Sequence, residues 1–156
     1  MIERKYSKDK THATQTLTTL IQADKEAVFH YLATTEGISS WFPQLSIADE
    51  TKEKSLVFDL GDGAAEKMAL FDYITNEHIA FEWATGKVEF HLEESDKETK
   101  LILTETLPLN FNALVPDFTG WFIQMKNVKS VVETGQAATI DKDEIQMIQS
   151  EVKEAY

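Results

Sequence analysis

Glu105 is the side chain in this sequence with the clearest potential for chemistry, because it interrupts an apolar pattern. Leu101, Leu103 and Leu107 share one face of a predicted strand, and Glu105 falls on that same face. A carboxyl group buried in apolar surroundings has a raised pKa, and it could anchor a polar group of a ligand or act as an acid. The alternative is that the strand ends here and Glu105 reaches water at the rim. We favour this second interpretation, because period-two patterns are least reliable at the ends of elements.

Histidines offer a second possible chemistry, metal binding. The four of them are spread along the chain, at His12, His30, His78 and His91. A metal site needs ligands that converge at helix or hairpin spacing, and no such histidine pair occurs. Glu89, His91 and Glu93 share one strand face, but it is the face that we assign to solvent. We therefore predict no metal site and no cofactor.

Motifs for nucleophilic catalysis or phosphate binding are also missing from the sequence. There is no cysteine, and no serine lies in a Gly-x-Ser-x-Gly elbow. The glycines at residues 61–63 are too few for a phosphate-binding loop and fit a hairpin turn instead. We name no catalytic residue, and an enzyme remains open only through side chains that the fold would have to bring together.

Composition restricts the classes of partner. The chain has 156 residues, is 42% hydrophobic, and carries a formal charge of −12, which disfavours binding to nucleic acids and anionic membranes. No apolar run approaches the ~20 residues of a membrane span, and residues 1–10 lack the apolar segment of a secretory signal. We expect a cytoplasmic protein without an integral membrane segment. The cations near the start of the chain suit a solvated arm better than a binding patch.

A long amphipathic helix is the element that must position any site. Its apolar residues recur at steps of three and four: Phe118, Trp121, Met125, Val128 and Val132, with Phe122 and Val131 beside them. Pro116 and Asp117 suit its first turn, and Gly135 suits the left-handed residue that follows its last turn. A helix with so wide an apolar face must pack against something large.

Strand patterns of period two precede this helix. They run through residues 14–23 and from residue 45 to residue 107, with turns expected at 61–63, 76–77, 85–86 and 94–100. The inward positions are Leu56, Phe58, Leu60, Phe71, Tyr73, Ile79, Phe81, Trp83, Val88, Phe90, Leu92, Leu101 and Leu103. The strand around Phe71 does not choose a face cleanly, and we place Phe71 inward because Asp72 should point to solvent. We expect six or seven antiparallel strands.

Helical segments are predicted at two further places. Asp24 suits the N-cap of a brief helix that ends near Thr34, and one more short turn follows before Pro43. Trp41 and Phe42 lie in this polar stretch, so they must fold back onto the core or line an opening. Residues 136–156 form an additional C-terminal helix, which packs either on its own domain or on that of a neighbour.

This order of elements resembles the START-like, or SRPBCC, superfamily with its helix-grip fold. Within it, the chain is most similar to the family named for homology to the activator of the Hsp90 ATPase. The matching features are residues 23–29, Trp41, residues 81–83, residues 99–105, Gly120 with Trp121, and Gly135. The resemblance covers residues 14–135, and its order and spacing matter more than any single motif.

The resemblance implies an α+β fold in which a curved antiparallel sheet surrounds a long C-terminal helix, with a hydrophobic cavity between them. We divide the chain into an arm at residues 1–13, the domain at residues 14–135 and the additional helix at residues 136–156. The expected cavity residues are Trp41, Phe42, Phe58, Phe71, Phe81, Trp83, Phe90, Leu103, Glu105, Trp121, Phe122 and Met125. The alternative is that these side chains fill a solid core.

Three functions fit this interpretation. The first is a small cytoplasmic binding domain, monomeric or homodimeric, that takes a hydrophobic small molecule or lipid. The second is a chaperone-associated domain, or another protein-interaction domain, suggested by the name of the family and by the acidic surface. The third is a cyclase- or hydrolase-like enzyme acting on a hydrophobic substrate.

Overall fold

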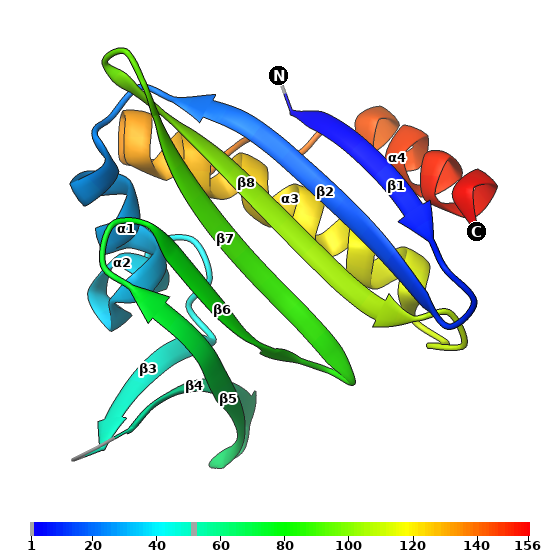
Figure 1. The fold of residues 1–156 in the computed structure, drawn as a ribbon, viewed down its shortest axis with the longest axis horizontal. Helices are drawn as coiled ribbons and strands as arrows, with labels where there is room; N and C mark the ends of the chain where they lie inside the picture. The colour runs from blue at the N-terminus through cyan, green and yellow to red at the C-terminus, as the bar shows by residue number, and fades with distance from the viewer. Residues whose placement is uncertain (1, 51–52) are drawn as a thin grey trace.

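The computed structural model describes residues 2–50 and 53–156, which form an antiparallel sheet packed against a long helix (Figure 1). The predicted α+β class is confirmed, with eight strands in the described residues instead of six or seven. Their order across the sheet is β1-β2-β8-β7-β6-β5-β4-β3. The strands are β1 (Glu3–Lys8), β2 (His12–Ile21), β3 (Leu45–Glu50), β4 (Glu53–Gly61), β5 (Ala64–Ile74), β6 (His78–Trp83), β7 (Gly86–Ser95) and β8 (Glu98–Pro108).

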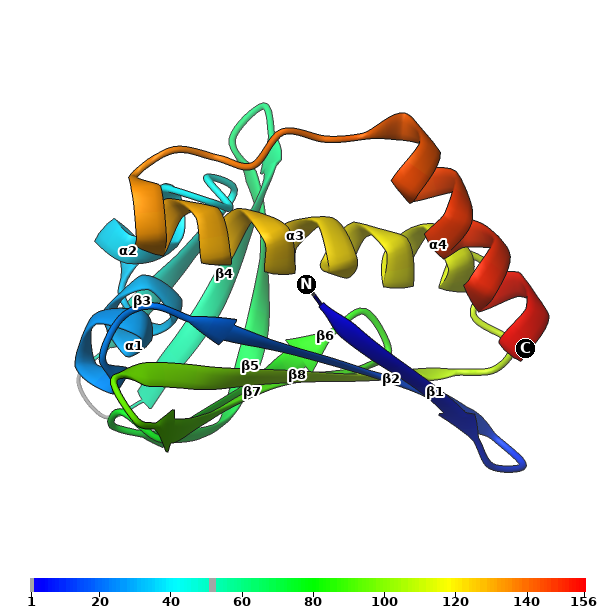
Figure 2. The same cartoon turned by 90° about the horizontal axis from the view of Figure 1, so that it is seen from above.

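Four helices accompany the sheet in the described residues: α1 (Lys25–Ala33), α2 (Thr35–Ser39), α3 (Leu114–Thr134) and α4 (Lys142–Ala155). The predicted ends are confirmed where a cap defines them. The Asp24 side chain accepts a hydrogen bond from the backbone N–H of Ala27, and Gly135 closes α3 with a φ of 79°. Figure 2 shows α3 along one face of the sheet, with α1 and α2 near one end of it and α4 near the other.

The first residues form a strand, so the prediction of a solvated arm is wrong. β1 pairs with β2 along its whole length, from Glu3 opposite Thr18 to Lys8 opposite Ala13. The sequence does not show which face of this strand points inward, because its residues are mostly charged. Arg4 and Tyr6 extend over the interior, while their neighbours face water. Arg4 then donates two hydrogen bonds to the carboxylate of Glu151 on α4, at 2.8 and 3.0 Å.

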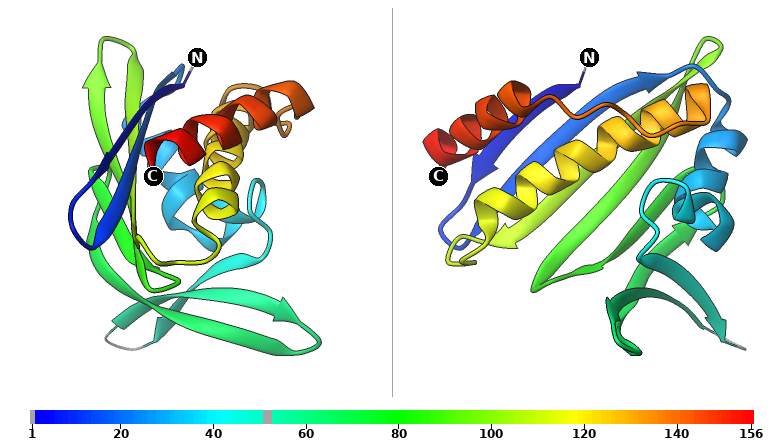
Figure 3. Two further views of the ribbon diagram at one scale, coloured as in Figure 1. Left: turned by 90° about the vertical axis from the view of Figure 1, so that its right-hand side faces the viewer. Right: turned by 180° about the vertical axis from the view of Figure 1, so that it is seen from behind.

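A bulge in β5 helps to curve the sheet and explains an error in the prediction. Leu70 pairs with Phe81 and Asp72 pairs with Ala80, so Phe71 is an extra residue without a partner across the ladder. The predicted inward position of Phe71 is wrong: this side chain is 56% exposed. Figure 3 shows the β3–β4–β5 end of the sheet at a steep angle to the β1–β2–β8–β7 part, with α3 in the hollow between them.

The C-terminal helix packs on its own domain. α4 contacts α3 and β1, and its residues Ile148 and Val152 are fully buried members of the hydrophobic core. The hydroxyl of Tyr156 donates to the carbonyl of Thr14 at 2.7 Å and so ties the end of this segment to β2. No helix within residues 2–50 and 53–156 combines the length and the apolarity that a membrane span requires.

Candidate functional site

Aromatic rings from several elements meet between the sheet and α3. This aromatic cluster consists of Trp41, Phe42, Phe58, Phe81, Trp83, Phe90 and Trp121. The Trp121 ring lies at its centre, with five other ring centroids 5.0 to 6.5 Å away. These are edge-to-face and tilted contacts of the kind that aromatic pairs prefer. The interior that we predicted as a cavity is therefore occupied largely by side chains of the protein.

Burial separates the predicted cavity residues into three groups. Eight are at most 5% exposed and present little surface to a ligand: Trp41, Phe81, Phe90, Leu103, Glu105, Trp121, Phe122 and Met125. Three others, Phe42, Phe58 and Trp83, are only partly buried. Phe71 lies apart from both groups, on an exposed bulge. The accessible part of the predicted site is thus the side of the aromatic cluster that carries Phe42, Phe58 and Trp83.

Two recesses open at this side of the cluster, and together we call them the mouth. One, of about 180 Å³, is lined by Phe42, Trp83, Asp117, Gly120, Trp121 and Gln124. The other, of about 150 Å³, is lined by Phe58, Leu60, Glu66, Met68, Trp83, Ala84 and Asp117. Trp83 and Asp117 belong to both recesses, so they form the ridge between them. The combined volume of the two recesses lies just inside the lower end of the ~300–1,000 Å³ range of small-molecule sites.

Asp117 holds the Trp83 side chain in place. The indole N–H donates to both carboxylate oxygens of Asp117, at 3.0 and 3.2 Å. Asp117 lies in the first turn of α3, where a carboxylate also interacts favourably with the positive end of the helix. The sequence indicated only this second role. Trp83 lies at the end of β6, so the contact depends on how sheet and helix pack, and no local pattern could reveal it.

Glu105 is buried behind the mouth, and the interpretation that it reaches water at the rim is wrong. β8 continues to Pro108, so position 105 is inside the strand, and the side chain is 0% exposed. The Gln15 amide donates to Glu105 Oε1 at 3.0 Å and to the carbonyl of Phe118 at 2.9 Å. Within the described residues, Glu105 Oε2 and Gln15 Oε1 have no hydrogen-bond partner.

The surroundings of Glu105 favour its protonated form. Burial raises the pKa of this carboxyl well above its usual value, and the nearby Asp117 raises it further. The hydrogen bond from Gln15 acts in the opposite direction and is the weaker influence. The two acidic groups therefore differ in their surroundings: the carboxyl of Glu105 is buried, and that of Asp117 is partly exposed.

Replacing Glu105 should change how stability depends on pH. The unfolded chain loses this proton near pH 4.5, whereas the folded chain retains it to higher pH, so wild-type stability should fall as pH rises between the two pKa values. One such proton gives a slope of up to ~1.4 kcal/mol per pH unit. Glu105→Gln should remove this decline, which urea unfolding between pH 4 and pH 9 would measure. The exposed Glu154→Gln should behave as the wild type does, and an unchanged slope in Glu105→Gln would contradict the assignment.

A separate groove of about 530 Å³ lies between α3, α4 and β1. Its lining residues are Ile2, Arg4, Phe122, Lys126, Lys129, Ser130, Glu133, Thr134, Ala138, Glu144 and Met147. The three cations all bind groups of the protein: Arg4 pairs with Glu151, Lys126 with Glu144, and Lys129 with Glu133. The charged groups of the groove therefore connect neighbouring elements of the fold. Among the described residues, the groove has no counterpart of the pair at the mouth, where the carboxyl of Glu105 is buried and that of Asp117 is accessible.

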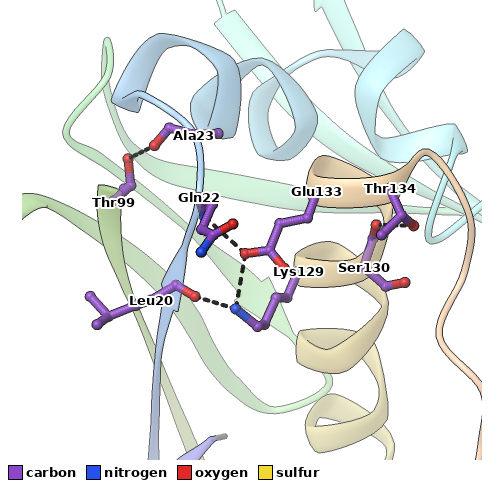
Figure 4. Close-up of polar contacts among 8 residues, drawn as sticks. All are labelled: Leu20, Gln22, Ala23, Thr99, Lys129, Ser130, Glu133 and Thr134. Atoms are coloured by element: carbon purple, nitrogen blue, oxygen red, sulfur yellow. Dashed lines mark hydrogen bonds and ion pairs between the residues drawn. The ribbon is translucent and has the colours of Figure 1, made fainter. Parts of the chain in front are cut away.

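Figure 4 shows one of these attachments, between α3 and the end of β2. The Lys129 ammonium donates to the Leu20 carbonyl at 2.5 Å and to Glu133 Oε2 at 3.0 Å. The same Glu133 oxygen accepts from the backbone N–H of Gln22 at 2.8 Å. These bonds fix the C-terminal half of α3 against the sheet.

Similar proteins are found among solved structures. No protein-family model and no curated protein matches the chain. A conserved protein of unknown function from Enterococcus faecalis, EF2215, is 29% identical, with a TM-score of 0.85 over 97% of this chain and 89% of that one. CalU16 from Micromonospora echinospora is 17% identical, with a TM-score of 0.73 over 99% and 95%. The Aha1 dimer from Colwellia psychrerythraea is also 17% identical, with a TM-score of 0.67 over 80% and 98%. The latter two likenesses concern the fold alone.

Proposed function

We propose that this protein is a small-molecule binding domain of the helix-grip type and that its ligand binds at the mouth. The observation that carries the proposal is the pair of recesses on either side of the Trp83–Asp117 hydrogen bond. Small-molecule sites are mostly apolar, with a few polar groups that fix orientation. The rings of Phe42 and Phe58 would supply the apolar contact, and Asp117 would supply the polar one.

The size of the site limits the ligand. The interior behind the mouth contains the aromatic cluster, whose Trp121 side chain is only 2% exposed. A long lipid chain could enter only by displacing such rings, which would sacrifice close-packed contacts. A short amphipathic molecule with a ring or a branched apolar group fits the two recesses without that displacement. We therefore favour such a molecule over a lipid.

We also infer a relationship to the SRPBCC superfamily and, within it, to the activator of the Hsp90 ATPase. The resemblance in residues 14–135 supports it, as does the similarity in fold to the Aha1 dimer. Contact with a chaperone is a second candidate function, suggested by this relationship alone. Small-molecule binding is the function that the geometry of the mouth supports best.

Thermal unfolding with a library of small amphipathic molecules would test the proposal. A compound present at 100 times its Kd should raise the free energy of unfolding by ~2.7 kcal/mol. Trp83→Leu should abolish the stabilisation because it removes the ridge shared by both recesses. The matched control is Phe71→Leu, which removes an exposed ring elsewhere and should leave binding unchanged. A library without a stabilising compound, or compounds that bind Trp83→Leu equally well, would contradict a ligand site at the mouth.

A further inference from the structure

The larger recess of the mouth is bounded by three aromatic rings that contact one another. The ring centroids of Trp83 and Trp121 are 5.0 Å apart, those of Phe42 and Trp121 5.7 Å, and those of Phe42 and Trp83 6.1 Å. Phe42 and Trp83 are partly exposed, whereas Trp121 is 2% exposed and lies deeper. A cation placed over the face of such a ring is attracted, because the ring carries negative charge density on its faces.

A carboxylate borders the same recess. Asp117 lines it, and both oxygens of this carboxylate accept from the indole N–H of Trp83. The bond from the Trp83 indole is from a neutral donor, so the negative charge of Asp117 is not cancelled. Asp117 is partly exposed at the mouth, whereas the carboxyl of Glu105 is buried behind it.

The surroundings determine which sign of charge the recess accepts. The positive end of α3 amounts to roughly half a unit charge and offsets part of the charge of Asp117. Glu66 adds a second acidic side chain in the adjoining recess, and the whole chain carries a formal charge of −12. The balance at the mouth is negative, so an anionic ligand would be repelled and a cationic one attracted.

From this arrangement we infer that the larger recess binds an alkylated ammonium group, held by the rings of Phe42 and Trp83 and by the carboxylate of Asp117. The inference rests on the proposed function and specifies its ligand class: a small apolar molecule with a tertiary or quaternary amine. Aromatic rings beside a carboxylate suit such a group because it is both apolar and positively charged. The second recess, with Phe58, Leu60 and Met68, receives the apolar part of the same molecule.

Paired probes of equal shape would test the inference. The cation is phenyltrimethylammonium, its neutral isostere is tert-butylbenzene, and binding is followed by the NMR signal of the Trp83 indole N–H, which lies in the mouth. We expect the cation to bind at least fivefold more tightly than the isostere. Asp117→Asn retains an acceptor for the indole but removes the charge. It should therefore weaken the affinity for the cation about tenfold and change the affinity for the isostere less than twofold.

Controls separate charge at the site from charge in general. Asp96→Asn removes one carboxylate from the turn between β7 and β8, where asparagine tolerates the φ of 57°, and it should leave both affinities unchanged. Equal affinity for the two probes would overturn ammonium recognition, as would an equal loss of affinity for the cation in Asp117→Asn and Asp96→Asn. Either result would leave small-molecule binding at the mouth in place. A Trp83 signal that responds to neither probe would overturn the ammonium inference, and the library screen would then decide the broader proposal.

Discussion

Deletion of residues 136–156 is expected to unfold the domain. The segment contributes Ile148 and Val152 to the core, both 0% exposed, and its loss would also uncover the side chains beneath them. Burial of each such side chain is worth about 1.5–3 kcal/mol. The free energy lost with both side chains, together with that of the apolar surface that they cover, approaches the ~5–15 kcal/mol stability of a typical domain. Circular dichroism and urea unfolding of the shortened chain would measure the effect.

Point variants in the full-length chain make this test specific. Ile148→Ala should cost ~2–5 kcal/mol, the usual range for removing a buried isoleucine side chain. Met147→Ala on the same helix is the matched control, because Met147 is 48% exposed and should change stability by less than ~1 kcal/mol. A shortened chain that keeps the wild-type urea midpoint would show that the C-terminal segment is dispensable for the core.

Trp121→Ala should lower the free energy of unfolding by ~3–5 kcal/mol, the usual cost of removing a large buried aromatic side chain. The ring is 2% exposed and contacts five other rings of the aromatic cluster, so its removal leaves a void that the rigid sheet cannot easily close. Phe71→Ala removes an aromatic ring that is 56% exposed and should cost well under half as much. Urea unfolding of both variants gives the comparison, and a loss below ~1 kcal/mol for Trp121→Ala would disagree with a tightly packed cluster.

Strong periodic patterns made most of the fold predictable from sequence. The 3.6-residue period of α3 and its closing Gly135 were local signals, and the packing confirmed them. Hairpin turns were equally local: residues 61–63 and Asn76 adopt the positive φ values that such turns use. The class of fold followed from these elements, because a helix so apolar on one face needs a large partner and the segments before it have the period of strands.

The errors arose where a residue's environment depends on distant parts of the chain. Arg4 and Tyr6 were predicted to lie in an exposed arm, because the sequence does not show that the C-terminal segment packs over them. Phe71 was misplaced because the bulge in β5 shifts the alternation of faces by one residue. Asp117 and Glu105 approach each other only after helix and sheet have packed, so the paired carboxyl groups of the candidate site had no sequence signature.

The contact between β1 and α4 has a consequence for folding during synthesis. Arg4 and Glu151 are 147 positions apart, and α4 leaves the ribosome after every other described element. Until then the inner face of β1, with Arg4 and Tyr6, lacks its cover, and the edge strand of the nascent sheet can associate with other chains. Slow translation or a stall just before α4 should therefore promote aggregation of the newborn polypeptide, although the finished protein is well packed.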